Sequence, residues 1–225
     1  MARGFIETQY LENGTPIVRP SFDVGAMIAP TMIERIAVIG SGQMGNGIAQ
    51  VAACSGFEVV MIDIDQTFLD RGLKTIETSL SKLVSKERMT QKDADAARSL
   101  ISTATQKSAC SESDLVVEAI PEVPELKYST FNQLDSICRP DAILASNTSS
   151  ISITKIAEQT QRGDRVIGMH FMNPVPIMKL VEIINGVETS DETNIAVTEV
   201  AEKMGKTPLN CNDSPGLVSN RILCP

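Results

Sequence analysis

Short apolar runs alternate with helical patterns along most of this chain, and that alternation constrains the fold more than any other feature. The apolar runs have the length of buried strands and lie at residues 36–39, 58–62, 115–117 and 142–144. Helical patterns lie at residues 44–55, 66–88, 124–137 and 151–158. Strands that are apolar on both faces and alternate with helices form a parallel sheet covered on both sides. The sequence therefore predicts an α/β fold of Rossmann type, with a doubly wound and mostly parallel sheet.

The pattern changes near the C-terminal end of the chain. Val166–Phe171 and residues 179–184 both have the pattern of strands, and the few residues between them include two prolines. A crossover between parallel strands needs about a dozen residues or more, so we expect an antiparallel strand pair here. A helix near residues 192–204 and a short segment at 207–210 follow.

Composition limits the class of partner and the compartment. The formal net charge of −8 argues against nucleic acid or an anionic membrane as a partner, because such binding depends on Lys and Arg. The five cysteines are odd in number and widely spaced, which predicts free thiols in a reducing compartment and neither a disulfide framework nor a metal site. We expect the cytoplasm, with the mitochondrial matrix or the peroxisome as alternatives. The first 31 residues lack the pattern of a secretory or transit peptide and predict a loosely ordered extension.

A glycine motif follows the first apolar run and opens the first helical pattern. Gly40, Gly42 and Gly45 have the G-x-G-x-x-G spacing of a turn that holds a pyrophosphate at a helix N-terminus. Asp63 ends the second apolar run and is placed to accept hydrogen bonds from the adenosine ribose. No Arg is adjacent to it, so the motif favours NAD over NADP as cofactor. An ordinary glycine turn, with Asp63 as a helix cap, is the alternative.

His170 is the only histidine of the chain and lies at the C-terminal end of an expected strand. That end of the strands is where open α/β sheets bind ligands. Glu182 lies on the expected return strand and could reach the imidazole. A carboxylate on one ring nitrogen fixes the tautomer and raises the basicity of the other. The pair is a candidate general base, and a packed core imidazole is the alternative.

Four segments together resemble the NAD-binding domain of the 3-hydroxyacyl-CoA dehydrogenase family. They are GSGQMGNGIA at 40–49, SNTSS at 146–150, HFMNPVP with MKLVE at 170–182, and PGLVSNR at 215–221. The resemblance runs from about residue 32 to the end of the chain. It implies an oxidoreductase of fatty-acid and lipid metabolism that oxidises (S)-3-hydroxyacyl-CoA to 3-oxoacyl-CoA with NAD.

The resemblance also implies roles for single residues. His170 matches the general base, Glu182 its orienting carboxylate, and Ser149 with Asn220 the residues that hold the substrate oxygen. The positions that match NAD contacts are Gly40, Ser41, Gly42, Gln43, Met44, Gly45, Asp63, Glu122, Lys127 and Ser149, and those that match coenzyme A contacts are Ser79, Lys86 and Asn173.

The coenzyme A positions have a separate physical argument. Ser79, Lys82 and Lys86 step by three and four residues, so they share one face of the expected helix in a locally basic stretch. Such a face suits the phosphates of coenzyme A. A solvated lysine-rich helix surface is the alternative.

Departures from the family pattern concern two apolar positions and the end of the chain. Met172 and Leu217 stand where the family has phenylalanine. Family members continue into a C-terminal helical domain that forms a homodimer, and residues 216–225 are expected to be its start after a dinucleotide domain over residues 32–215. Two alternatives therefore remain: an NAD-binding module that is catalytically weak or silent, and a 3-hydroxyacid dehydrogenase that acts without coenzyme A.

Overall fold

The structure, a computed structural model, describes residues 6–10, 16–20 and 32–213 and divides the chain into two units, Met1–Thr31 and Met32–Pro225. In the first unit, β1 (Ile6–Tyr10) pairs antiparallel with β2 (Pro16–Pro20). The expectation of a loosely ordered extension did not include this strand pair. Whether residues 216–225 begin another domain stays a prediction, because they lie outside the described residues.

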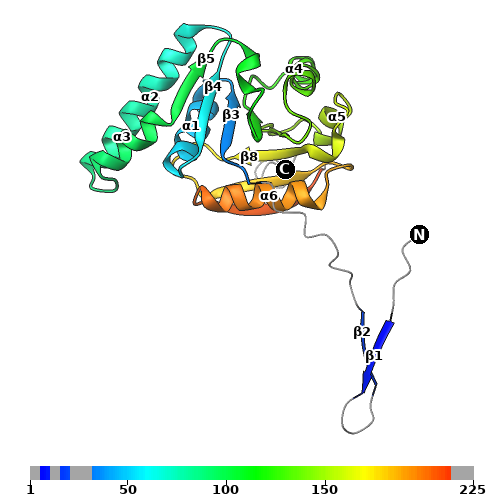
Figure 1. Ribbon diagram of the computed structural model, residues 1–225. Coiled ribbons are helices and arrows are strands. Elements are labelled where there is room, and N and C mark those ends of the chain that lie inside the picture. Colours follow the sequence, from blue (N-terminus) through cyan, green and yellow to red (C-terminus); the bar gives the residue numbers. More distant parts are fainter. Residues whose placement is uncertain (1–5, 11–15, 21–31, 214–225) are drawn as a thin grey trace, which may run out of the picture. The chain divides into compact units, whose positions relative to one another are not determined.

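The second unit is built on one eight-stranded sheet in the order β10-β9-β8-β7-β6-β3-β4-β5 (Figure 1). The strands are β3 (Arg35–Ile39), β4 (Glu58–Ile62), β5 (Ile101–Ala104), β6 (Leu115–Glu118), β7 (Ile143–Ser146), β8 (Val166–Phe171), β9 (Leu180–Asn185) and β10 (Thr207–Asn212). All neighbours pair in parallel except β8 and β9, which pair antiparallel. The predicted fold class, including the antiparallel pair, is confirmed.

Helices cover both faces of the sheet. They are α1 (Gln43–Cys54), α2 (Gln66–Ser85), α3 (Gln91–Ser99), α4 (Pro124–Ile137), α5 (Ile153–Ala157), α6 (Asp191–Lys203) and the 3-10 turns η1 (Lys107–Cys110) and η2 (Gly163–Arg165). Alternate residues of β3 enter two different cores: Ile36 and Val38 pack in the core with α1, α2, α3 and α6, and Ala37 and Ile39 in the core with α4, α5 and η1. This explains why the strand is apolar at every one of these positions.

The region after α2 differs from the sequence prediction. The helix expected at residues 66–88 ends at Ser85, and Glu87 has a φ of 55°, which a continuing right-handed helix does not allow. The additional elements are α3 and the edge strand β5. Helix α3 buries only Ala94 and Ala97 within a polar sequence, so it has no large apolar stripe by which the sequence could reveal it.

Among the described residues, no helix combines the length and the apolar character that a bilayer crossing requires.

Candidate active site

The glycine motif forms the turn between β3 and α1, and its glycines meet distinct spatial demands. Gly40 has a φ of 99°, a conformation that favours glycine. A Cβ at Gly45 would lie 1.8 Å from the Gly40 carbonyl oxygen, so helix α1 can approach the turn only without a side chain there. A Cβ at Gly42 would meet no protein atom within 4 Å. Gly42 is also the N-cap of α1 and makes no side-chain cap hydrogen bond, which suits anion binding at this helix end.

Asp63 follows β4 and fixes the glycine turn. One carboxylate oxygen, Oδ2, accepts hydrogen bonds from the backbone N–H and the hydroxyl of Ser41, both at 2.7 Å. Asn46 fixes the same turn from α1, since its amide donates to the Gly42 carbonyl at 2.6 Å. Asn46 is buried, and no spacing rule in the glycine motif indicated it. The alternative role of Asp63 as a helix cap is not observed, because Asp65 caps α2 instead.

A cavity of about 720 Å³ opens at this turn. Gly40, Gly42, Gln43, Met44 and Asp63 line it, as a dinucleotide site requires, whereas Ser41 and Gly45 do not. Its remaining wall comes from residues that the sequence did not indicate, and these include Phe68 of α2, Lys107 of η1 and Leu126 of α4. An open pocket beside an uncapped helix N-terminus and a carboxylate fits the pyrophosphate and the ribose of NAD.

His170 and Glu182 face each other directly across the antiparallel β8–β9 pair. The imidazole Nδ1 lies 2.8 Å from Glu182 Oε2, and both residues are buried. The contact that the sequence made possible is present, and the role of Glu182 in orienting a catalytic imidazole stays a prediction. The strand end is fixed as well, because the Phe171 N–H donates to the side-chain oxygen of Asn147 at 2.9 Å. Nε2 makes no hydrogen bond to the parts of the chain that the structure describes, which suits a nitrogen that exchanges a proton with substrate.

The loop after β7 carries Ser149, and Glu122 organises it. Glu122 Oε1 accepts hydrogen bonds from the backbone N–H groups of Ser149 and Ser150 at 2.9 and 3.1 Å, and from the hydroxyl of Thr148. Burial raises the pKa of Glu122, but these hydrogen bonds and the charge of Lys127 outweigh it and hold the pKa below its usual range. Glu122 is therefore ionised at neutral pH and binds the loop as a carboxylate.

Lys127 lies inside the protein and does not face the cavity. Its side chain is 1% exposed, and its ammonium contacts Glu118 at 2.7 Å, Glu122 at 3.3 Å and the Ile120 carbonyl oxygen at 3.3 Å. These partners use its three donors. The observed contacts of Lys127 are therefore with the loop after β6, and direct contact with NAD stays a prediction.

Residues expected at coenzyme A line a second cavity, of about 750 Å³. It lies between α2 and the segment after β8, and its lining includes Ser79, Lys82 and Asn173. The Gln43 amide donates to Asn173 at 3.2 Å and joins this cavity to the glycine turn. Lys86 is the C-cap residue after α2 and does not line the cavity. Asn220, expected at the substrate oxygen, lies outside the described residues.

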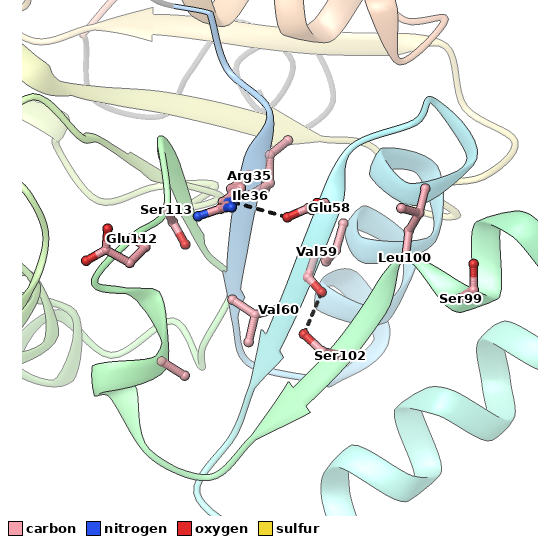
Figure 2. Close-up of a pocket in the computed structure, with 11 residues that line it drawn as sticks. Arg35, Ile36, Glu58, Val59, Val60, Ser99, Leu100, Ser102, Glu112 and Ser113 are labelled. Carbon is pink, nitrogen blue, oxygen red and sulfur yellow. Dashed lines mark hydrogen bonds and ion pairs between the residues drawn. The ribbon is translucent and has the colours of Figure 1, made fainter.

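A smaller cavity of about 370 Å³ lies at the amino ends of β3 and β4 (Figure 2). His170 lies near the carboxyl end of β8, and β3, β6, β7 and β8 run parallel, so the cavity and His170 are at opposite ends of the strands. Arg35 and Glu58 form an exposed ion pair of 3.1 Å beside it. None of the residues predicted for the active site lines this cavity.

A dinucleotide turn and a buried histidine–carboxylate pair at one sheet edge are the arrangement of a nicotinamide-dependent oxidoreductase. The sequence model described as "3-hydroxyacyl-CoA dehydrogenase, NAD binding domain" matches residues 35–214. The chain therefore belongs to the 3-hydroxyacyl-CoA dehydrogenase family and carries its NAD-binding domain.

Individual relatives agree with this assignment. A probable 3-hydroxybutyryl-CoA dehydrogenase of Deinococcus radiodurans is 56% identical over 85% of this chain and 68% of its own length. The human mitochondrial hydroxyacyl-coenzyme A dehydrogenase is 40% identical over 98% of this chain and 71% of its own length. The crystal structure of (S)-3-hydroxybutyryl-CoA dehydrogenase from Ralstonia eutropha is 46% identical over 86% of this chain and 68% of its own, with a TM-score of 0.84. The chain thus spans about two thirds of the length of these relatives.

Proposed function

We propose that this chain oxidises (S)-3-hydroxyacyl-CoA to 3-oxoacyl-CoA, with NAD as the hydride acceptor, and that His170 is the general base. The observation that carries the proposal is the 2.8 Å contact between His170 Nδ1 and Glu182 Oε2, buried at the sheet edge where the glycine turn lies. Relatives named as 3-hydroxybutyryl-CoA dehydrogenases supply the substrate class.

The proton transfer follows from the geometry of this pair. In neutral His170 the Nδ1–H donates a hydrogen bond to Glu182 Oε2, which leaves the Nε2 lone pair available for the 3-hydroxyl proton. The imidazolium that forms is stabilised by the adjacent carboxylate. A positioned base of this kind contributes roughly 10²–10⁴ in rate. NAD bound at the glycine turn would supply the acceptor for the hydride that leaves C3.

The remaining residues bind and orient. Ser149 lies on the loop that Glu122 holds and is proposed to hold the developing carbonyl oxygen together with Asn220. Glu122 is proposed to contact NAD at the same loop. Ser79, Lys82 and Asn173 line a cavity that suits coenzyme A, and Lys86 would add positive charge beside it.

The compartment and the assembly belong to the same proposal. The odd number and wide spacing of the five cysteines support a reducing compartment such as the cytoplasm or the mitochondrial matrix. A homodimer is the assembly expected of the family.

The test uses the full chain and its His170→Ala variant. Calorimetric titration measures NAD binding, and the loss of NADH absorbance with acetoacetyl-CoA measures turnover. We expect His170→Ala to keep NAD binding and to lose turnover. Turnover at the wild-type rate in that variant would remove His170 from the mechanism.

The same assays separate the alternatives. The second candidate is an NAD-binding module that is catalytically weak or silent. NAD binding without acyl-CoA binding or NADH oxidation would support it. Turnover of free 3-hydroxybutyrate as fast as of its thioester would support a dehydrogenase that acts without coenzyme A.

A further inference from the structure

The last residue of β6, Glu118, is a buried carboxylate at the carboxyl ends of the parallel strands, where the candidate active site lies. It is fully buried, and both of its oxygens are hydrogen-bonded. Oε1 accepts from the Lys127 ammonium and from the Ile120 backbone N–H, both at 2.7 Å. Oε2 accepts from the Ser146 hydroxyl at 2.7 Å. A buried carboxylate is tolerated only when its charge and its lone pairs are matched in this way.

Two routes lead from Glu118 to the loop that carries Ser149. In the first, Lys127 connects Glu118 at 2.7 Å to Glu122 at 3.3 Å, and Glu122 accepts the Ser149 N–H. In the second, the Ser146 hydroxyl donates to Glu118 and accepts the Thr148 N–H at 3.3 Å. The two routes therefore end on adjacent backbone groups of one loop, the Ser149 N–H and the Thr148 N–H.

We propose that Glu118 is a positioning residue that sets the loop carrying Ser149, through Lys127 on one side and Ser146 on the other. The consequence for turnover rests on the proposed function of Ser149, whereas the consequence for the order of the loop does not. Displacing a reacting group by about 1 Å can cost about 10²-fold in rate, so a rigid anchor behind the loop has a catalytic value.

The competing explanation is that Glu118 and Lys127 only hold α4 against the sheet. A second buried ion pair offers a matched control for that explanation. Asp135 in the last turn of α4 contacts Arg162 at 2.7 Å, and their side chains are only 16% and 10% exposed. Arg162 also donates to the carbonyl oxygen of Cys138, next to the end of α4 and away from the Ser149 loop.

The test compares Glu118→Gln, the double variant Glu118→Gln/Lys127→Met and Asp135→Asn in the full chain. Glu118→Gln removes a buried negative charge that contacts the Lys127 ammonium, whereas the double variant removes the positive and the negative charge together. Amide hydrogen exchange of Ser149 and Ser150, followed by NMR, reports the order of the loop. Melting temperature reports stability, and kcat and KM with acetoacetyl-CoA and NADH report function.

We expect Glu118→Gln to lower the melting temperature and the double variant to recover most of it. In both variants the amide exchange rates of Ser149 and Ser150 stay about tenfold or more above the wild-type rates. A tenfold change in rate corresponds to the loss of about one charge-assisted hydrogen bond. In the double variant kcat stays roughly tenfold to hundredfold down, with KM nearly unchanged. Asp135→Asn lowers the melting temperature but leaves exchange and kcat at the wild-type level.

Wild-type exchange and kcat in a stable double variant would overturn the positioning role, and so would equal loop exchange in Asp135→Asn. If Glu118→Gln does not fold, the double variant and its control decide alone. If the wild-type chain fails to oxidise NADH, the proposed function fails, and the exchange measurement still decides the role of Glu118.

Discussion

Replacing Glu182 with Gln removes one charge from the centre of the proposed mechanism and keeps the shape of the side chain. His170 Nδ1 and Glu182 Oε2 lie 2.8 Å apart, with side chains 11% and 1% exposed. Unit charges about 4 Å apart attract by about 4 kcal/mol at an effective dielectric constant of about 20. The imidazolium that forms as His170 takes the substrate proton has this attraction, whereas the neutral imidazole of the ground state has little of it.

A glutamine at residue 182 still accepts the Nδ1 hydrogen bond, so only part of that energy is lost. We expect a loss of about 2–4 kcal/mol of transition-state stabilisation, which corresponds to roughly 30- to 1000-fold in kcat. The assay is NADH formation from NAD and (S)-3-hydroxybutyryl-CoA at saturating substrate, the direction in which His170 takes up the proton, and calorimetry verifies that NAD binding is retained.

The matched control is Glu58→Gln. Glu58 forms an ion pair with Arg35 at 3.1 Å, but the side chains are 64% and 56% exposed and lie at the far edge of the sheet. An exposed pair contributes about 0–1 kcal/mol to stability, and we expect no change in kcat. Wild-type turnover in Glu182→Gln, or an equal fall in both variants, would refute the role of the buried carboxylate.

Three further outcomes follow from the structure. Gly42→Ala should fold normally and bind NAD weakly, since its Cβ would enter the open cavity, whereas Gly45→Ala should lose about 1–3 kcal/mol or more of stability from its clash with the turn; melting curves and NAD titration separate the two. Lys82→Ala should raise KM for acyl-CoA and leave NAD affinity unchanged. The control is Lys155→Ala, because Lys155 is exposed and does not line this cavity. If Lys82→Ala and Lys155→Ala have the same KM for acyl-CoA, the cavity is not a coenzyme A site. Burial raises the pKa of Asp213, but hydrogen bonds from the Ser152 hydroxyl and the Thr154 N–H outweigh burial, so the pKa lies below its usual value. The ionised carboxylate therefore stabilises the folded state above about pH 4, and this stabilisation is lost as pH falls through the lowered pKa. Urea unfolding should therefore show Asp213→Asn less stable than wild type at pH 7 and equal to it at strongly acidic pH.

Local patterns in the sequence determined the class of fold and part of the site. Buried strands and amphipathic helices each have their own periodicity, so the sheet could be predicted from runs of a few residues. The segment between β8 and β9 is too short for a crossover, and this alone predicted the antiparallel pair that places His170 opposite Glu182. The glycine turn was predictable for the same reason, because its spacing and its neighbouring elements are all local.

The sequence was weakest where the signal is small or the partner is distant. Helix α3 buries two alanines in a polar sequence, and β5 is a short edge strand, so neither has a clear periodic pattern. Asn46 supports the glycine turn by a hydrogen bond that no motif encodes. The contact of Gln43 with Asn173 joins positions 130 residues apart.

Only the tertiary structure shows which charged residues are buried and which partners they contact. In the sequence, Glu118 is a polar residue at the end of an apolar run. The sequence predicted that Lys127 contacts NAD. Folding buries both, because the ammonium of α4 meets the carboxylate of β6 at 2.7 Å and the Ser146 hydroxyl of β7 completes the set. The sequence by itself determined most of the elements, though not α3 and β5, and it placed the glycine turn at the carboxyl ends of the strands, since these features depend on local patterns. Which carboxylate pairs with His170 and which is buried against Lys127 and Ser146 depends on partners from separate segments, and only the folded chain brings these together.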